Sequence, residues 1–299
     1  MRTILTLIKR NVKLFFKDKG MFFTALITPV ILLVLYATFL GNVYEDSFRQ
    51  GLGGASISDE LMQACVGGQL VSSILAVSCV TVAFCSNMLM VQDKANGCRR
   101  DLVISPVKAS TLSVAYYAAS LFSTLIICLT ATAICLGYLA VVGWYLSATD
   151  VLWLILDVIL LATFGTALSS VINFFLSTQG QIASVGTIVS SGYGFICGAY
   201  MPTSQFSDGL QTVISFLPGT YGTSLLRNHA MRGALSELEE QGVPAEAVDG
   251  MRDVMDCNLY FFEQKVSMGA MVAVLILAVA VLLGLYILLN LRKMTKSGR

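Results

Sequence analysis

Charged side chains are scarce in this chain. They make up 12% of its 299 residues, whereas roughly 25% is usual in a soluble domain. Hydrophobic residues make up 56% of the chain, and its mean hydropathy is +0.76. A soluble core cannot bury so much apolar surface, but a lipid bilayer can accommodate it. The composition therefore excludes an ordinary soluble domain and predicts an integral membrane protein.

Histidine is nearly absent, and the cysteines follow no disulfide framework. The one histidine, His229, has no Cys, Asp or Glu at ligand spacing, so we expect no metal site. The 8 cysteines mostly lie within apolar runs, where Cys acts as a small hydrophobe. No cluster of His, Asp and Glu is visible near a membrane interface, which argues against a membrane-embedded enzyme.

A phosphate-binding loop is missing as well. An ATP motor needs G-x-x-x-x-G-K-[ST], and the sequence contains no Gly-Lys dipeptide. The tetrapeptide Val66-Gly67-Gly68-Gln69 opens an apolar run with no such motif to face, so close helix packing explains its glycines better. We therefore expect no nucleotide site and no cofactor in this chain.

Charge-free runs mark the expected membrane spans. A helix crosses the hydrocarbon in about 20 residues, so the run Val158–Ser207 holds two spans, divided at the polar cluster Ser177–Gly180. The Gly209–Leu226 run contains Pro218 and several hydroxyl groups, and we expect a re-entrant or interfacial segment there. The prediction is an all-α integral membrane protein with six transmembrane helices, at about 21–41, 66–91, 111–142, 151–175, 181–201 and 267–291.

Basic residues are concentrated in three segments. The N-terminal segment, the 92–108 loop and the C-terminal tail carry six, four and four of the 19 Lys and Arg residues, beside only three acids. By the positive-inside rule both termini are cytosolic, which requires an even number of spans. A segment of about 20 residues with a helical pattern precedes the first span, so we expect an uncleaved anchor rather than a signal peptide.

The N-terminal segment, residues 1–19, predicts a basic amphipathic helix in the cytosolic interface. Lys9, Arg10, Lys13 and Lys17 share one narrow face, and apolar side chains fill the other, apart from Asn11. Such a helix anchors to anionic membrane lipid, and its basic face could also dock a cytosolic partner. Both interpretations remain open.

The 92–108 loop predicts a short element with two different faces. Asn96-Gly97 is a helix stop, and Ser105-Pro106 is a helix start. Three charged residues and then three apolar residues lie between them: Arg99, Arg100, Asp101, Leu102, Val103 and Ile104. A solvated positive-inside loop would explain the arginines but not the apolar triplet so well. The element could therefore insert into a groove on another protein.

These features together resemble the type-2 family of ABC exporter permeases (the ABC-2-type transmembrane subunit). The amphipathic helix is followed by a first span that contains Pro29, and the charged loop ends in Leu102-Val103-Ile104-Ser105-Pro106. In the tract Gly192–Arg227, Gly198–Pro202 and Phe216–Tyr221 look like family elements, although Leu217 stands where the family usually has Asn.

The resemblance implies an exporter built from two permease copies, identical or related, and two separate ABC ATPase subunits that bind ATP and Mg. The chain would be a single permease domain, 1–299, in the plasma (inner) membrane, with no nucleic-acid partner. The 92–108 loop would be the coupling helix and the N-terminal helix a second contact. The residues so assigned to ATPase coupling are Lys9, Arg10, Lys13, Arg99, Arg100, Asp101, Leu102, Val103 and Ile104.

Two features inside the spans are further candidates. Asp157 is the one acid within a span; it is either a hydrated rim residue near Asp150 and Trp153 or a polar site on a transport pathway. No basic residue lies in a predicted span to pair with it. Small residues recur every four positions at Gly186, Ser190, Gly194 and Gly198. This face predicts close packing within the chain or, as the resemblance suggests, a dimer seam or pathway lining.

Residues 202–266 are expected to form the re-entrant segment and a small external insert. Two short helices, Ser236–Gln241 and Pro244–Asp256, are predicted, with Val248, Met251 and Met255 on one stripe. The leading hypothesis is a permease that exports an amphipathic drug, peptide, lipid or glycan. The alternative, an ion-coupled secondary transporter, is weakened by the absence of paired polar residues at midplane.

Overall fold

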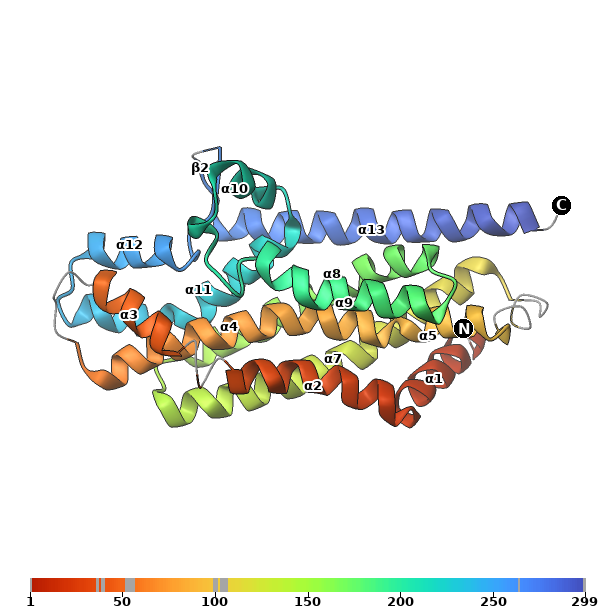
Figure 1. The fold of residues 1–299 in the computed structure, drawn as a ribbon, viewed down its shortest axis with the longest axis horizontal. Coiled ribbons are helices and arrows are strands. Elements are labelled where there is room, and N and C mark those ends of the chain that lie inside the picture. The colour runs from red at the N-terminus through yellow and green to blue at the C-terminus, as the bar shows by residue number, and fades with distance from the viewer. Residues whose placement is uncertain are drawn as a thin grey trace.

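Long helices run roughly along one axis of the molecule (Figure 1). The computed structural model describes residues 2–35, 38, 41–51, 57–98, 102, 107–262 and 264–297. The elements are α1 (Arg2–Lys17), α2 (Lys19–Leu35), α3 (Gly41–Gly51), α4 (Asp59–Ser86), α5 (Met88–Ala95), α7 (Ala109–Val142), α8 (Ala148–Phe175), α9 (Gln179–Ile196), a 3-10 turn (Thr203–Gln205), α10 (Asp208–Ser215), α11 (Pro218–Glu240), α12 (Ala245–Val254), β1 (Tyr260–Phe261), β2 (Gln264–Lys265) and α13 (Met268–Ser297).

Four stretches of helix in the described part of the chain are long and apolar enough to cross a membrane. They are Asp59–Ala95, Ser110–Val142, Ala148–Phe175 and Met268–Arg292. The other two expected spans correspond to α2, with 17 residues, and α9, with 18 residues and several Gln, Ser and Thr side chains. The helical architecture is confirmed in this coarser form, while the six spans stay a prediction.

Local sequence sets the helix boundaries. Ser147 and Asp150 form a capping box at the start of α8, and Thr178 and Gln181 form another at the start of α9. α8 ends at Phe175, so the break expected at Ser177–Gly180 is confirmed. These caps satisfy backbone N–H groups that the first helical turn leaves unpaired, which is why each new helix begins at its polar residue.

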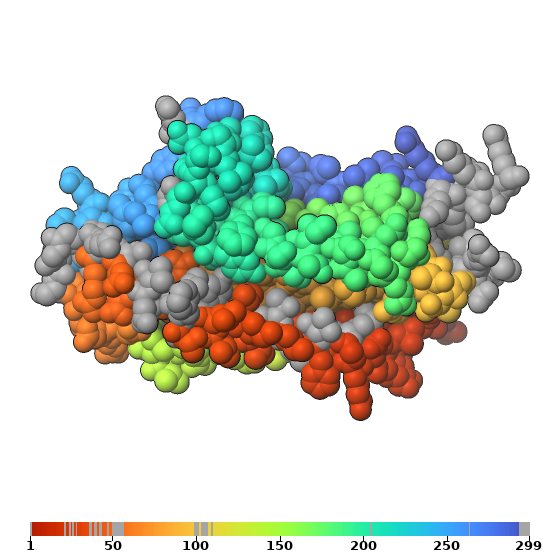
Figure 2. All heavy atoms as spheres, viewed as in Figure 1, coloured from red at the N-terminus to blue at the C-terminus, as the bar shows by residue number. Residues whose placement is uncertain are grey.

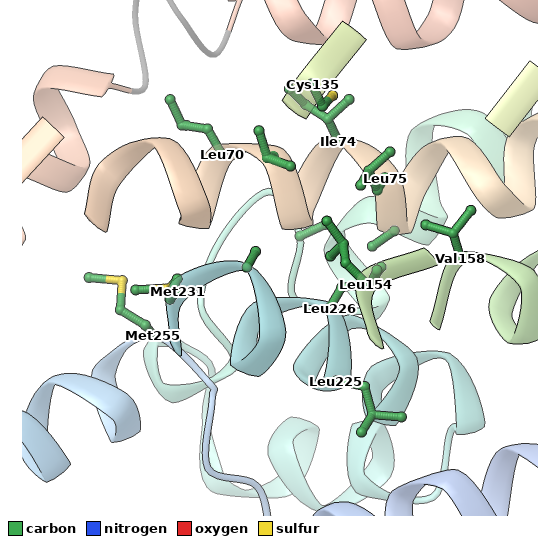
Figure 3. Close-up of a cluster of buried hydrophobic side chains, with 14 of the residues drawn as sticks. Leu70, Ile74, Leu75, Cys135, Leu154, Val158, Leu225, Leu226, Met231 and Met255 are labelled. Carbon is green, nitrogen blue, oxygen red and sulfur yellow. The ribbon is translucent and has the colours of Figure 1, made fainter. Parts of the chain in front are cut away.

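α4 is the central helix of the bundle. It packs against α2, α7, α8, α9 and α11, and 89% of its most apolar stretch is buried. A Cβ at Gly68 would lie 2.9 Å from the carbonyl oxygen of Ala230 on α11, so the packing explanation for Gly67 and Gly68 is confirmed. Figure 3 shows buried side chains that α4, α7, α8, α11 and the end of α12 contribute to this core. Those labelled are Leu70, Ile74, Leu75, Cys135, Leu154, Val158, Leu225, Leu226, Met231 and Met255.

α11 differs most from the sequence-based expectation. The predicted separate helix at Ser236–Gln241 is wrong, because α11 continues without a break from Pro218 to Glu240. Its last turns are amphipathic, and Leu235 and Leu238 are buried in the core. The burial of these side chains stabilises the helix across the charged stretch. The stripe of Val248, Met251 and Met255 is confirmed as buried.

The segment between α11 and α13 also contains a short hairpin that the all-α expectation did not include. β1 and β2 pair antiparallel, with Tyr260 opposite Lys265, and Phe262 takes a positive φ of 46° in the connection. Aromatic contacts support this turn, since the rings of Phe216 and Phe261 lie 5.1 Å apart. Figure 2 shows the region around α10 standing out from the viewed face of the molecule.

The two termini lie at the same end of the molecule, and α3 and α12 lie at the opposite end (Figure 1). This placement agrees with the even number of crossings expected from the basic residues. The side of the membrane on which the termini lie stays a prediction.

Candidate functional site

Three side chains join α1 to α5 and α7 at the end of the molecule where the termini lie. Arg10 contacts Asp93 in a bidentate pair, with Nη1 2.6 Å from Oδ2 and Nη2 3.1 Å from Oδ1. The hydroxyl of Tyr116 donates to the same Oδ2 at 2.6 Å. The hydrogen bonds from Arg10 to Asp93 raise the pKa of Arg10 above its usual value. We call this cluster the Arg10–Asp93–Tyr116 latch.

The predicted basic face of α1 divides into two groups. Lys9 and Lys13 are exposed, whereas Arg10 is half-buried in the latch. The opposite face, with Leu7, Asn11 and Phe15, is buried. α1 therefore packs on the bundle, chiefly on α7, and presents two lysines outward beside the latch.

The 92–108 loop is described in part. Arg99, Arg100, Asp101, Val103 and Ile104 lie outside the described residues. Leu102 is described and packs, together with Val107, against a buried cluster to which α1, α5, α7, α8 and α13 contribute. The members of that cluster are Leu7, Met90, Leu112, Ala115, Tyr116, Phe174 and Tyr286. The loop and α1 thus share one packed core at this end of the molecule.

Lys94 connects the base of the same loop to α8. Its ammonium group donates to the carbonyl oxygens of Asn173, Phe174 and Leu176 at 2.9, 2.8 and 3.0 Å. These carbonyls belong to the C-terminal end of α8, where a cation also compensates the negative end of the helix dipole. α5, which carries Asp93 and Lys94, is therefore bonded to α1, α7 and α8.

The small-residue face of α9 makes contacts within the chain. A Cβ added at Gly194 would overlap the ring of Tyr200. Gly198 lies after the end of α9 and takes a positive φ of 74°, and a Cβ there would lie 2.9 Å from Thr203 and 3.0 Å from Asp256. Gly186 and Ser190 are half-buried, and a Cβ at Gly186 would meet Met88 at 3.5 Å. The role of this face in a dimer seam or pathway stays a prediction.

Asp157 on α8 contacts His229 on α11. Its Oδ2 lies 2.5 Å from Nδ1 of the imidazole, and the two side chains are 6% and 10% exposed. The indole of Trp153 stacks on the imidazole at a centroid distance of 5.8 Å. The sequence did not indicate this pair, because His229 was expected in the external insert and only a Lys or Arg within a span was expected to pair with Asp157.

Comparison with known protein families identifies the family to which this chain belongs. A family model described as ABC-2 type transporter matches residues 2–230, which is most of the chain. The chain belongs to this family. A comparison with curated proteins found no match.

Membership in the ABC-2 family has direct consequences. The chain is a multi-pass membrane permease of a family that lacks a nucleotide-binding domain and works with an ABC ATPase. This agrees with the missing Gly-Lys dipeptide and argues against the ion-coupled secondary transporter. The described residues contain no group of three or more His, Cys, Asp or Glu that could hold a metal ion.

The ABC-2 permease also contains a buried ion pair that the sequence did not reveal. Arg227 on α11 is 1% exposed, and its Nη1 lies 2.9 Å from Oδ2 of Asp256, just after α12. Its Nη2 donates to the carbonyl oxygen of Gly198, and Asp256 also accepts from the backbone N–H and the hydroxyl of Thr203, both at 2.7 Å. One arginine thus joins α11, the end of α9 and the segment after α12.

Proposed function

We propose that this ABC-2 permease exports an amphipathic substrate (a drug, peptide, lipid or glycan) from the cytosol, driven by ATP hydrolysis in a separate ABC ATPase. Two permease copies, identical or related, would assemble with two ATPase subunits, which bind the ATP and Mg. Both termini would be cytosolic in the plasma (inner) membrane. Family membership supports the partnership with an ATPase, and the positive-inside distribution supports the orientation.

One structural observation supports a coupling role for particular residues, which family membership alone does not specify. The Arg10–Asp93–Tyr116 latch joins the N-terminal helix to the base of the 92–108 loop, the two elements for which the family resemblance implies ATPase contact. A bidentate Arg–carboxylate pair fixes orientation as well as distance. Displacement of the loop by a bound ATPase would therefore move α1 and α5 together, and Lys94 would transmit the displacement to α8.

The experiment is reconstitution of the permease with its ABC ATPase. Replacement of Arg99, Arg100 and Leu102 by Ala should remove the stimulation of ATP hydrolysis by the permease, because the loop would lose two charged side chains and the apolar contact that packs it on the bundle. Purification of the complex followed by phosphate-release assays measures this.

The matched control for the loop variant is Arg252→Ala on α12, at the other end of the molecule. This variant should assemble and stimulate as the unsubstituted permease does. Unchanged assembly and unchanged stimulation in the triple loop variant would show that the loop is not the coupling element.

A further inference from the structure

A cavity of about 330 Å³ lies between α8, α11 and the start of α13. Its walls are apolar except at the Asp157–His229 pair, and Trp153 lies at its edge. The apolar lining comes from Leu156, Leu160, Leu225, Met268 and Val272. In Figure 3, Leu225 points to the opposite side of α11 from Leu226, which faces the core. The cavity therefore lies on the other side of α11 from Leu226, and Leu225 links its wall to the central buried cluster.

The pair in this cavity has unused bonding capacity. Within the described part of the chain, Oδ1 of Asp157 and Nε2 of His229 have no hydrogen-bond partner, and both residues line the cavity. A buried carboxylate is costly unless a positive group or several hydrogen bonds compensate it. A neutral imidazole supplies one hydrogen bond and no positive charge.

Other charged groups on the packed elements do not compensate Asp157. Arg232, one turn after His229, lies 3.4 Å from Asp150 instead, and its side chain is 58% exposed. α13 carries no charged residue between Met268 and Leu291. An ionised Asp157 beside a neutral imidazole would place one net negative charge between the apolar walls of the cavity.

We propose that this cavity binds an ammonium group carried on an apolar body, supplied either by an amphipathic amine or by an aminophospholipid. The ammonium would contact Oδ1 of Asp157, the face of Trp153 would add a cation–π interaction, and the apolar part would fill the cavity. Trp153 near the start of α8 and the first turn of α13 both begin long apolar helices, so the cavity would lie near the membrane interface, where amphipathic cations gather. Binding requires neither ATPase nor transport, so its test is independent of the proposed function.

The fluorescence of Trp153, which lines the cavity, can report ligand binding. The chain contains 2 tryptophans, so Trp144→Phe leaves Trp153 as the only indole. The full chain with this substitution is placed in nanodiscs of phosphatidylglycerol alone, which contain no ammonium group. Benzyltrimethylammonium should change Trp153 emission saturably, whereas neopentylbenzene, its neutral carbon isostere, should bind at least about tenfold more weakly. Equal binding of the two probes would overturn the proposal.

Three variants locate the site. Asp157→Asn keeps the shape and removes the charge, and it should weaken binding of the cation about tenfold or more. Gly269→Leu should fill part of the cavity while both members of the pair are kept, because Gly269 lines the cavity and a Cβ there meets no atom within 4 Å. Asp150→Asn is the matched control: Asp150 is on the same helix, pairs with Arg232 and lines no part of this cavity. The Asn oxygen can still accept the capping hydrogen bonds from Ser147, so α8 should keep its start and binding should be unchanged.

A further experiment with a second lipid distinguishes the two sources of the ammonium group. If the ligand is a lipid, nanodiscs containing phosphatidylethanolamine should change Trp153 emission and weaken benzyltrimethylammonium binding. Neither effect should occur in Asp157→Asn. If the ligand is a soluble amine, phosphatidylethanolamine should leave both the emission and the binding unchanged. Full affinity for benzyltrimethylammonium in folded Asp157→Asn would refute the site. Should that variant not fold, full affinity in Gly269→Leu would refute it equally.

Discussion

Arg227 carries a permanent charge although it is among the largest fully buried side chains of the molecule. Asp256 compensates that charge, and its own backbone has a positive φ of 54° that the surrounding contacts must hold in place. The pair thus fixes the position of a strained residue between α12 and the hairpin. Arg227 ends the tract that resembles the family, but nothing in the sequence identified its partner 29 residues away.

Replacement of Arg227 by Met should therefore destabilise the protein strongly. The free energy of unfolding should fall by about 3–5 kcal/mol, because the substitution leaves a buried, uncompensated carboxylate. Thermal unfolding in detergent micelles measures the change. Arg252→Met is the control, since Arg252 pairs with Glu239 at 3.7 Å and both side chains are partly exposed, so its effect should be small. An unchanged unfolding temperature for Arg227→Met would contradict the assigned role.

At the scale of elements, α1 is held to the bundle by an apolar face and by the Arg10–Asp93–Tyr116 latch. Its apolar face is incomplete, since Asn11 is buried among Leu7 and Phe15, and Leu5 is 65% exposed. The hydrogen bonds of the latch therefore fix the orientation of α1 on the bundle more closely than its apolar contacts alone would.

Asp93→Asn should loosen α1. Because Arg10 is partly exposed, solvent screens the pair, and we expect the loss of about 1 kcal/mol, or roughly fivefold faster trypsin cleavage at Lys9 and Lys13. Limited proteolysis in nanodiscs, followed by mass spectrometry, measures the rate. Asp59→Asn, an exposed carboxylate at the start of α4, should leave it unchanged. Equal cleavage of native protein and Asp93→Asn would mean that the latch does not hold α1.

The elements themselves were largely predictable, and their side-chain pairs were not. Charge-free runs and the polar break at Ser177–Gly180 located α4, α7, α8, α9 and α13, because membrane helices need long apolar stretches. The length of α11 was missed, since Pro218 and its hydroxyl-rich first turns are typical of irregular structure. Contacts such as Asp157–His229, 72 positions apart, depend on how helices pack, and periodicity within one helix carries no such information.

At the scale of the whole molecule, Cys98 offers a test of orientation. It is the exposed one among 8 cysteines, all of which are described, and it lies in the 92–108 loop. A membrane-impermeant maleimide should label it in inside-out vesicles and not in right-side-out vesicles. Labelling from the outer side would reverse the proposed topology.

Cys257 is the internal control for that labelling. Burial raises the pKa of its thiol to about 12, so the reactive thiolate is suppressed throughout the range from pH 7 to pH 9. Labelling of Cys257 should therefore remain slow across this range in the folded protein and become fast after denaturation. Rapid labelling of Cys257 in the folded state would show that the segment after α12 opens.

The central position of α4 has a consequence for synthesis. α4 emerges from the ribosome early, yet α8 and α11, which cover much of it, follow much later in the chain. Until α8 and α11 are synthesised, polar side chains of α4 that are buried in the folded protein, such as Gln69 and Ser72, must lie in lipid or in the insertion machinery. α13 has no such need, because only 11% of its apolar window is buried in the protein. Chains that stop short of α11 should therefore be recognised and degraded, with α4 as the exposed signal.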